Sequence, residues 1–169
     1  NCNLEEAQDI FEELFLTESF KTEAICFLTQ IDLMNNEPKF TNSLMDKKYH
    51  DRVSQIQCME TYGNYYLTKK KYYQSLRIFN ELLDLDNCNI EALVKIATIY
   101  ERVDEIEKSL YYVRKVLEQE SDNKNILLTL GRINIKNNDT REAIRNLSRY
   151  NRRYKNDGEC LYELALLNK

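Results

Sequence analysis

Apolar residues recur at helical spacing along the chain. In one stretch, Phe79 and Leu82 follow Ser75 by steps of four and seven residues. The same steps occur in two later stretches, at Ser109, Val113 and Val116 and at Ala143, Leu147 and Tyr150. Residues at i, i+4 and i+7 share one face of an α-helix, so each stretch predicts an amphipathic helix whose apolar face begins with a small residue.

A second set of small residues precedes these helices at a constant interval. Gly63, Ala97, Gly131 and Ala165 follow one another at steps of 34 residues. Bulky residues four positions earlier keep the same interval, at Met59, Leu93, Leu127 and Leu161. A fixed period of this length predicts a stacked array of helix-turn-helix units. Because Gly inside a helix costs about 1 kcal/mol relative to Ala, its use in this column predicts a close crossing of two helices.

The period divides the chain into units of one helix pair each. With Gly63 as the eighth residue of its unit, we predict a single array over residues 1–169 with regular units at 56–89, 90–123 and 124–157. Residues 158–169 are predicted to form the first helix of a further or capping unit, and residues 1–21 the second helix of a partial unit. A chain with this layout is expected to be a piece of a longer array.

The unit at 22–55 is predicted to be degenerate and to contain an irregular insert. Thr29 and Asp32 occupy columns that elsewhere hold small or aromatic residues, and Pro38 interrupts the pattern within "NNEPKF". Pro ends or kinks a helix, so the second helix of this unit is expected only over residues 41–49.

Two sequences resemble capping boxes at the start of second helices. In "DEIE" and "DTRE", Asp104 and Asp139 each precede a Glu by three residues. An Asp at the N-cap accepts a backbone N–H of the first turn, so we predict that Asp104 and Asp139 cap the second helices of their units.

The unit around Gly63 resembles the tetratricopeptide repeat. That family places a bulky residue, Leu-Gly and Tyr on the first helix and Ala, Phe and Ala on the second; "ETYGNYY" and "SLRIFNELL" follow this order. The chain departs from the pattern where the usual proline near the end of each unit is replaced by Asn87, Ser121 and Lys155. The resemblance implies an all-α fold, a right-handed α-solenoid of antiparallel helix pairs whose concave groove, lined by first helices, binds partners.

The resemblance also indicates which residues line the groove. They are Glu60, Asn64, Leu67, Val94, Thr98, Glu101, Arg102, Leu128, Arg132, Ile135 and Lys136. Leu67, Val94, Leu128 and Ile135 are apolar at positions expected to face solvent, and charged residues surround them, so we expect an extended or helical peptide to bind there. The alternative is that these apolar residues pack against neighbouring helices.

One subset of the family binds the C-terminal carboxylate of chaperones through Lys and Asn side chains. Of the positions that this clamp uses, only Asn64 matches, and Glu60 stands where a cation should meet the carboxylate. Like charges repel, so the chaperone-clamp interpretation is rejected.

A run of basic residues ends the second helix of the unit at 124–157. Arg149, Arg152, Arg153 and Lys155 form a basic patch. Cations at a helix C-terminus suit the helix dipole, which is the favoured explanation. A site for an acidic partner is the second interpretation, and an RNA contact in which Tyr150 and Tyr154 stack on bases is the third.

Composition limits the remaining functions. The net charge of −4 makes nucleic acid an unlikely partner, and His50 is the only histidine. The sequence contains no Gly-rich phosphate loop and no metal-ligand cluster, so we expect no enzyme activity, no cofactor and no metal site. Five cysteines without a C-x-x-C spacing favour a reducing compartment, the cytoplasm or the nucleus. No window is apolar over the length needed to span a membrane.

Taken together, these features predict a non-catalytic scaffold for protein–protein interaction. The expected partner is a peptide segment or a subunit of a multisubunit complex, bound in the groove. The alternatives are an RNA-associated adaptor that uses residues 149–155 and a homodimer formed through terminal units or Tyr-rich faces.

Overall fold

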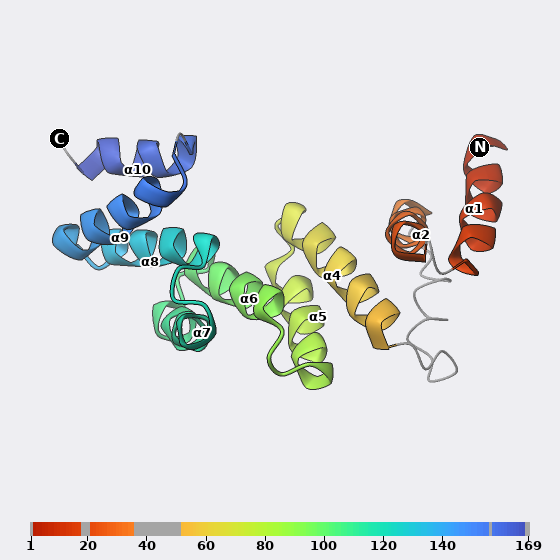
Figure 1. Ribbon diagram of the computed structural model, residues 1–169, viewed down its shortest axis with the longest axis horizontal. Helices are drawn as coiled ribbons and strands as arrows, with labels where there is room; N and C mark the ends of the chain where they lie inside the picture. Colours follow the sequence, from red (N-terminus) through yellow and green to blue (C-terminus); the bar gives the residue numbers. More distant parts are fainter. Residues whose placement is uncertain (1, 18–20, 36–51, 156, 168–169) are drawn as a thin grey trace. The chain divides into compact units, whose positions relative to one another are not determined.

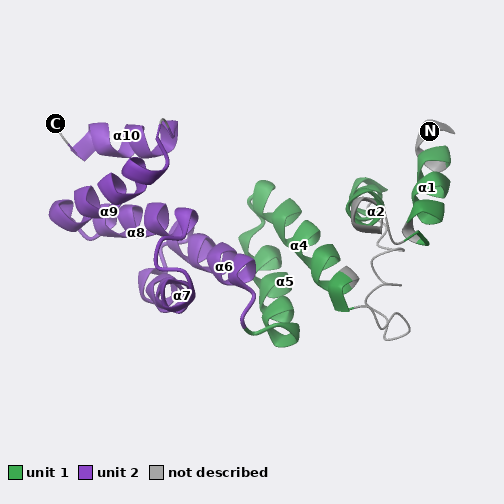
Figure 2. Ribbon diagram, in the orientation of Figure 1, with its two compact units in different colours: residues 1–87 green, residues 88–169 purple. Residues whose placement is uncertain are grey.

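The residues that the structure describes form helices and no strand. The computed structural model describes residues 2–17, 21–35, 52–155 and 157–167 (Figure 1). The chain divides into two compact units, residues 1–87 and residues 88–169 (Figure 2). The first contains α1 (Cys2–Phe15), α2 (Lys21–Asn35), α4 (Arg52–Thr68) and α5 (Tyr72–Leu85). The second contains α6 (Ile90–Arg102), α7 (Ile106–Gln119), α8 (Lys124–Lys136), α9 (Thr140–Arg153) and α10 (Gly158–Leu167). The all-α fold class is confirmed, while the helix predicted over residues 41–49 lies outside the described residues.

Consecutive helices pack in pairs, α4 on α5, α6 on α7 and α8 on α9. The connections within these pairs are short, residues 69–71, 103–105 and 137–139, so the paired helices are antiparallel neighbours. The middle residue of each connection has a positive φ, 57° at Lys70, 66° at Asp104 and 58° at Asn138. These three residues are one repeat apart, so the left-handed turn between the helices recurs with the period of the sequence.

The turn geometry corrects one predicted cap. Asp139 is the N-cap of α9, and its side chain accepts a hydrogen bond from the Glu142 N–H at 3.2 Å, as predicted. Asp104, in contrast, lies in the left-handed turn, and the N-cap of α7 is Glu105, which makes no side-chain cap hydrogen bond. The prediction for Asp104 was therefore wrong, because within the repeat Asp104 is the counterpart of Asn138 and not of Asp139.

First helices are capped by a column that the sequence analysis missed. The side chain of Asn89 accepts from the Ala92 N–H at 2.8 Å, and that of Asn123 accepts from the Ile126 N–H at 3.2 Å. Asp157 Oδ1 accepts from the Cys160 N–H at 3.3 Å at the start of α10. These caps are one repeat apart, and they set the start of the first helices where the family's usual proline is absent.

The small residues lie where paired helices cross. A Cβ added at Gly63 would lie 2.6 Å from Cζ of Phe79, and one added at Gly131 would lie 2.5 Å from Cδ2 of Leu147. At the Gly63 crossing, the Ser75 hydroxyl donates to the Gly63 carbonyl at 2.8 Å. The corresponding bond from Ser109 to the Ala97 carbonyl is 2.7 Å. The predicted close crossing is confirmed for both glycines, and the group that excludes a side chain there is the bulky residue of the second helix.

In the first unit, α2 packs on both α1 and α4. Ile25 and Leu28 are buried, and the Phe11 and Phe27 rings stack with their centroids 4.4 Å apart. Thr29, in the small-residue column, is also fully buried, and its hydroxyl contacts Cys58 Sγ at 3.6 Å. The unit predicted to be degenerate therefore still builds a packed first helix, which contacts α4 through Thr29 and Cys58.

Candidate partner-binding surface

The first helices α6 and α8 of the second unit lie side by side. The hydroxyls of Thr98 and Thr129 are hydrogen-bonded at 3.3 Å near the middle of the two helices. At their C-terminal ends, Lys136 Nζ donates to the Glu101 carbonyl at 2.5 Å and pairs with its carboxylate at 2.9 Å. The predicted groove residues Thr98, Glu101, Arg132 and Lys136 thus belong to one continuous face of adjacent first helices.

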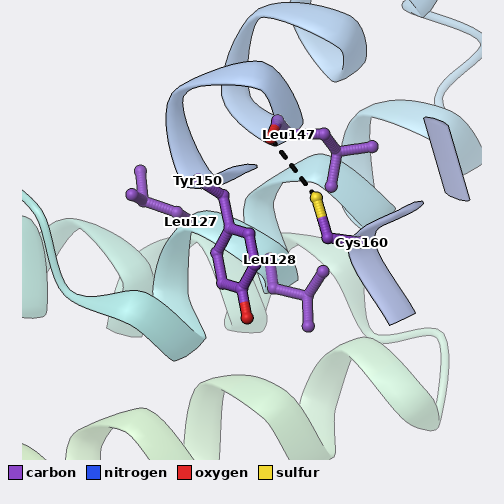
Figure 3. Close-up of a cluster of buried hydrophobic side chains, with 5 residues drawn as sticks. All are labelled: Leu127, Leu128, Leu147, Tyr150 and Cys160. Carbon is purple, nitrogen blue, oxygen red and sulfur yellow. Dashed lines mark hydrogen bonds between the residues drawn. The ribbon is translucent and has the colours of Figure 1, made fainter. Parts of the chain in front are cut away.

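Two of the predicted groove residues do not face solvent. Val94 is 2% exposed and Leu128 is 8% exposed, so the structure corrects the expectation that these apolar side chains are open to a ligand. Leu128 belongs to a buried cluster with Leu127, Leu147, Tyr150 and Cys160 (Figure 3). Ile135 also packs against this cluster. Leu128 of α8 therefore packs against α10, as the alternative interpretation of these apolar residues proposed.

Two cations of this face are each held by two carboxylates. Lys136 pairs with Glu101 and also with Asp104, at 3.3 Å. Arg132 pairs with Glu159 and, at 3.4 Å, with Glu163, both on α10. These ion pairs tie α6 to α8 and α8 to α10, so the first helices of the second unit form one laterally connected surface.

The ion pairs also stabilise the charged state of both cations. Burial lowers the pKa of Lys136, but its hydrogen bonds and charge interactions with Glu101 and Asp104 outweigh burial and raise that pKa. The pKa of Arg132 is likewise lowered by burial and raised more strongly by Glu159, Glu101 and Glu163. Glu101 is only 4% exposed, so its carboxylate serves Lys136 and presents little negative charge to a ligand.

What remains accessible on this face is mostly polar or aromatic. Arg102 is exposed, Thr98 is half-buried, and Tyr162 of α10 is 63% exposed. Tyr162 stands one repeat after Leu128, so the period of the sequence alone was enough to include it among the groove residues. We use "first-helix surface" for the accessible part of this face, namely Thr98, Arg102, Arg132, Lys136 and Tyr162.

The predicted groove residues of the first unit all lie on α4. Glu60, Asn64 and Leu67 are half-buried. Leu67 was expected to face solvent, but its side chain is only partly accessible, like those of Glu60 and Asn64.

The basic patch is partly neutralised by Asp122, which precedes α8. Arg149 and Arg153 both pair with Asp122, the latter at 2.6 Å, and the Tyr154 hydroxyl donates to the Asp122 carbonyl at 3.4 Å. Arg152 and Lys155 are exposed. Two of the four cations are therefore committed to one carboxylate, and they stabilise the connection that leads into α8.

The chain has three pairs of adjacent tyrosines, Tyr65–Tyr66, Tyr72–Tyr73 and Tyr111–Tyr112, and the last two pairs each place one ring at the surface. Tyr73 is 82% exposed and Tyr111 is 54% exposed, while their neighbours Tyr72 and Tyr112 are half-buried. Lys115 Nζ lies 4.8 Å from the centroid of the Tyr111 ring, a cation–π contact that the sequence analysis did not identify.

Among the described residues, no group of three or more His, Cys, Asp and Glu side chains is arranged to hold a metal ion. Within the same part of the chain, no helix combines the length and the apolar character needed to cross a membrane.

No protein-family model matches the chain, and no curated protein matches it. Several solved structures, in contrast, are similar to it. One is the first TPR of Spaghetti (RPAP3) bound to the HSP90 peptide SRMEEVD, which is 17% identical to this chain with a TM-score of 0.61. The match covers 67% of this chain and 90% of that chain. Another is TTC0263, a thermophilic TPR protein of Thermus thermophilus, which is 15% identical with a TM-score of 0.63. This match covers 98% of this chain and 90% of that protein.

A third similar structure is PilF of Pseudomonas aeruginosa. It is 16% identical with a TM-score of 0.57, and the match covers 97% of this chain and 90% of that protein. At these identities the likeness is one of backbone fold. The chain has the fold of tetratricopeptide repeat proteins.

Proposed function

We propose that this chain is a non-catalytic scaffold for protein–protein interaction that binds a peptide segment or a partner subunit on its first-helix surface. The observation that carries the proposal is the lateral connection of α6, α8 and α10 through Thr98, Lys136 and Arg132. These contacts hold the accessible side chains of three helices on one rigid face, which reduces the ordering cost of binding. The partner is expected to be a subunit of a larger intracellular complex.

The fold supports the proposal without identifying the partner. One protein of the same fold was solved with an HSP90 peptide bound. In this chain, Arg132 and Lys136 of the first-helix surface are already paired with carboxylates, and Glu60 stands at a position where the chaperone clamp uses a cation. The partner we propose is therefore recognised through aromatic and polar contacts, such as those that Tyr162 and Thr98 offer, and not through a terminal carboxylate.

The test compares two double variants with the same chemistry. Arg102→Glu with Tyr162→Glu changes the first-helix surface, whereas Arg114→Glu with Tyr73→Glu makes matched changes at exposed positions of second helices. We expect the first variant to lose partners that the unmodified chain captures, with affinity for an isolated partner lowered about tenfold or more, because exposed aromatic and Arg side chains contribute strongly at interfaces. Equal capture by both variants would show that partners bind elsewhere.

An RNA-associated role is the less favoured alternative. The ion pairs of Arg149 and Arg153 with Asp122 reduce the positive charge that the basic patch offers to phosphates. Loss of RNA binding on Arg152→Glu with Lys155→Glu, with protein partners retained, would revive it.

A further inference from the structure

The connection between α4 and α5 differs in charge from the equivalent connections of the second unit (Figure 1). Residues 69–71 are three lysines, and all three are exposed. One repeat later, residues 103–105 read Val-Asp-Glu, and one further on, residues 137–139 read Asn-Asn-Asp. No Asp or Glu occurs over residues 61–80. The connection therefore concentrates positive charge in a chain whose net charge is −4.

The ammonium groups at this connection contact aromatic rings. Lys69 Nζ lies 5.7 Å from the centroid of the Tyr65 ring, and Lys71 Nζ lies 5.9 Å from that of the Tyr66 ring. Among the described residues, neither lysine forms an ion pair with a carboxylate. The two rings pack edge to face with their centroids 5.6 Å apart. A cation–π contact orients an ammonium group without neutralising its charge, so these lysines keep their charge for a ligand.

Local stability accounts for only part of this charge. Lys69 and Lys70 follow the C-terminus of α4, where the helix dipole favours cations. Lys71, in contrast, is the N-cap of α5, where a cation opposes the dipole, and no side chain caps that helix. At the same position of α9, Asp139 accepts a backbone N–H. Lys71 therefore stands where an acidic or amide side chain would stabilise the fold better.

We propose that this connection binds an acidic segment of a partner protein. We use "lysine corner" for Lys69, Lys70 and Lys71 together with Tyr65 and Tyr66. Its ammonium groups can donate charge-assisted hydrogen bonds to carboxylates, and three adjacent lysines suit a segment that carries several of them. The lysine corner lies in the first unit and does not use the first-helix surface, so it adds a second contact to the proposed function.

The aromatic contacts favour a protein segment over a single-stranded nucleic acid. Nucleic acids of this kind bind by stacking bases on open aromatic faces as well as by charge. Tyr65 and Tyr66 are half-buried, pack against each other and each have a lysine over the ring. The lysine corner thus offers charge and N–H donors, which carboxylates need, without an open platform for bases.

The test measures binding of a short labelled peptide of alternating Glu and Ser to the chain by fluorescence anisotropy at low salt. A second peptide, in which Gln replaces every Glu, reports on the need for negative charge. A short strand of polyuridine reports on nucleic acid. We expect the acidic peptide to bind about tenfold or more tightly than either of the other two probes.

Lys71→Asp separates loss of binding from loss of structure. Lys71 has φ −83° and ψ 67°, close to the −89° and 72° of Asp139, so the new Asp can cap α5 as Asp139 caps α9. The midpoint of thermal unfolding should therefore rise, while the affinity for the acidic peptide falls. With Lys69→Glu added, we expect the loss of affinity to reach about tenfold or more.

The matched control is Arg152→Glu with Lys155→Glu, which changes the net charge by the same amount at exposed cations of the basic patch. We expect it to bind the acidic peptide within about threefold of the unmodified chain, as should Lys69→Arg with Lys71→Arg, which keeps the charge. The proposal is overturned if the acidic peptide does not bind, if both charge-reversed double variants lose affinity equally, or if the lysine-corner variant binds as well as the unmodified chain. Tighter binding of polyuridine, lost in the same variant, would overturn it in favour of a nucleic acid.

Discussion

At both helix crossings that hold a glycine, the glycine faces a bulky residue of the second helix, and across the three regular units the residues of these two columns vary in size together. Gly63 stands opposite Phe79 and Gly131 opposite Leu147, with no room for a Cβ. In the unit between them, Ala97 carries a methyl group and the counterpart of Phe79 is the smaller Val113. The period alone predicted that these positions are tight, but not which neighbour makes them so.

This size matching predicts that the effect of a methyl group at Gly63 depends on Phe79. Gly63→Ala places a Cβ 2.6 Å from the buried Phe79 ring. The alanine raises helix propensity by about 1 kcal/mol, but the clash outweighs this gain, and we expect a net decrease of about 1–2 kcal/mol in the free energy of unfolding. Combining it with Phe79→Val, which copies the pair at Ala97 and Val113, should cost less than the sum of the single changes by about 1 kcal/mol. Urea unfolding of the four proteins measures this coupling, and strict additivity would show that the two residues do not compete for space.

The carboxylate of Asp157 links a buried tyrosine to the start of α10. The Tyr150 hydroxyl donates to Asp157 Oδ2 at 2.6 Å, and this hydrogen bond, with the Cys160 N–H and Lys124, lowers the pKa of Asp157 from 3.8 to about 2. Burial and the same hydrogen bond raise the pKa of Tyr150. Since the folded state holds the ionised carboxylate, the stabilisation is present above about pH 4 and is lost as the pH falls from 4 to 2.

Removing the hydroxyl should therefore flatten the acid limb of the stability curve. In Tyr150→Phe the pKa of Asp157 moves back toward 3.8, so the free energy of unfolding should decrease less between pH 4 and pH 2 than in the unmodified protein. Tyr154→Phe is the control, because the Tyr154 hydroxyl contacts the Asp122 carbonyl instead. Parallel curves for Tyr150→Phe and the unmodified protein would show that this hydrogen bond does not set the pKa of Asp157.

Between helices, the sequence predicted the pairs better than the contacts from one pair to the next. The columns of Gly63 and Ser75 lie within one helix pair, and the period identifies them because every pair repeats the same crossing. Val94 and Leu128 share one column, and Leu128 packs against Cys160 of the adjacent α10, so the burial of this column depends on what the next helix brings to the contact. Sequence reasoning placed both residues in an open groove, and the structure buries them.

The contact between α6 and α8 predicts that removing Lys136, the cation paired with the buried Glu101, lowers the stability of the fold. Lys136→Met leaves the carboxylate of Glu101, 4% exposed, without its ammonium partner, and we expect a loss of about 1–3 kcal/mol in the free energy of unfolding. Adding Glu101→Gln should recover part of this loss, because the unpaired buried charge is removed.

The matched control is the pair formed by Lys108 and Glu105, which are 58% and 53% exposed. Lys108→Met should change stability by no more than about 0.5 kcal/mol, since exposed ion pairs contribute little. If Lys136→Met is equally silent, the contact between α6 and α8 does not depend on this ion pair.

For the molecule as a whole, the pairing of its cations predicts how partner binding responds to salt. The chain carries a net charge of −4, and Arg132, Lys136, Arg149 and Arg153 are all paired with carboxylates. A ligand that binds through Tyr162 and Thr98 releases few counterions, so a tenfold increase in salt should weaken it by no more than about threefold. A nucleic acid, in contrast, loses affinity with a slope of about 0.7–0.9 in log–log terms for each phosphate contacted, so three contacts already give a loss of about a hundredfold or more. Titration of an isolated partner at low and high salt decides between a partner on the first-helix surface and a nucleic acid on the basic patch. If affinity falls steeply with salt, and this salt dependence disappears in Arg152→Glu with Lys155→Glu, the binding belongs to the basic patch and not to the first-helix surface.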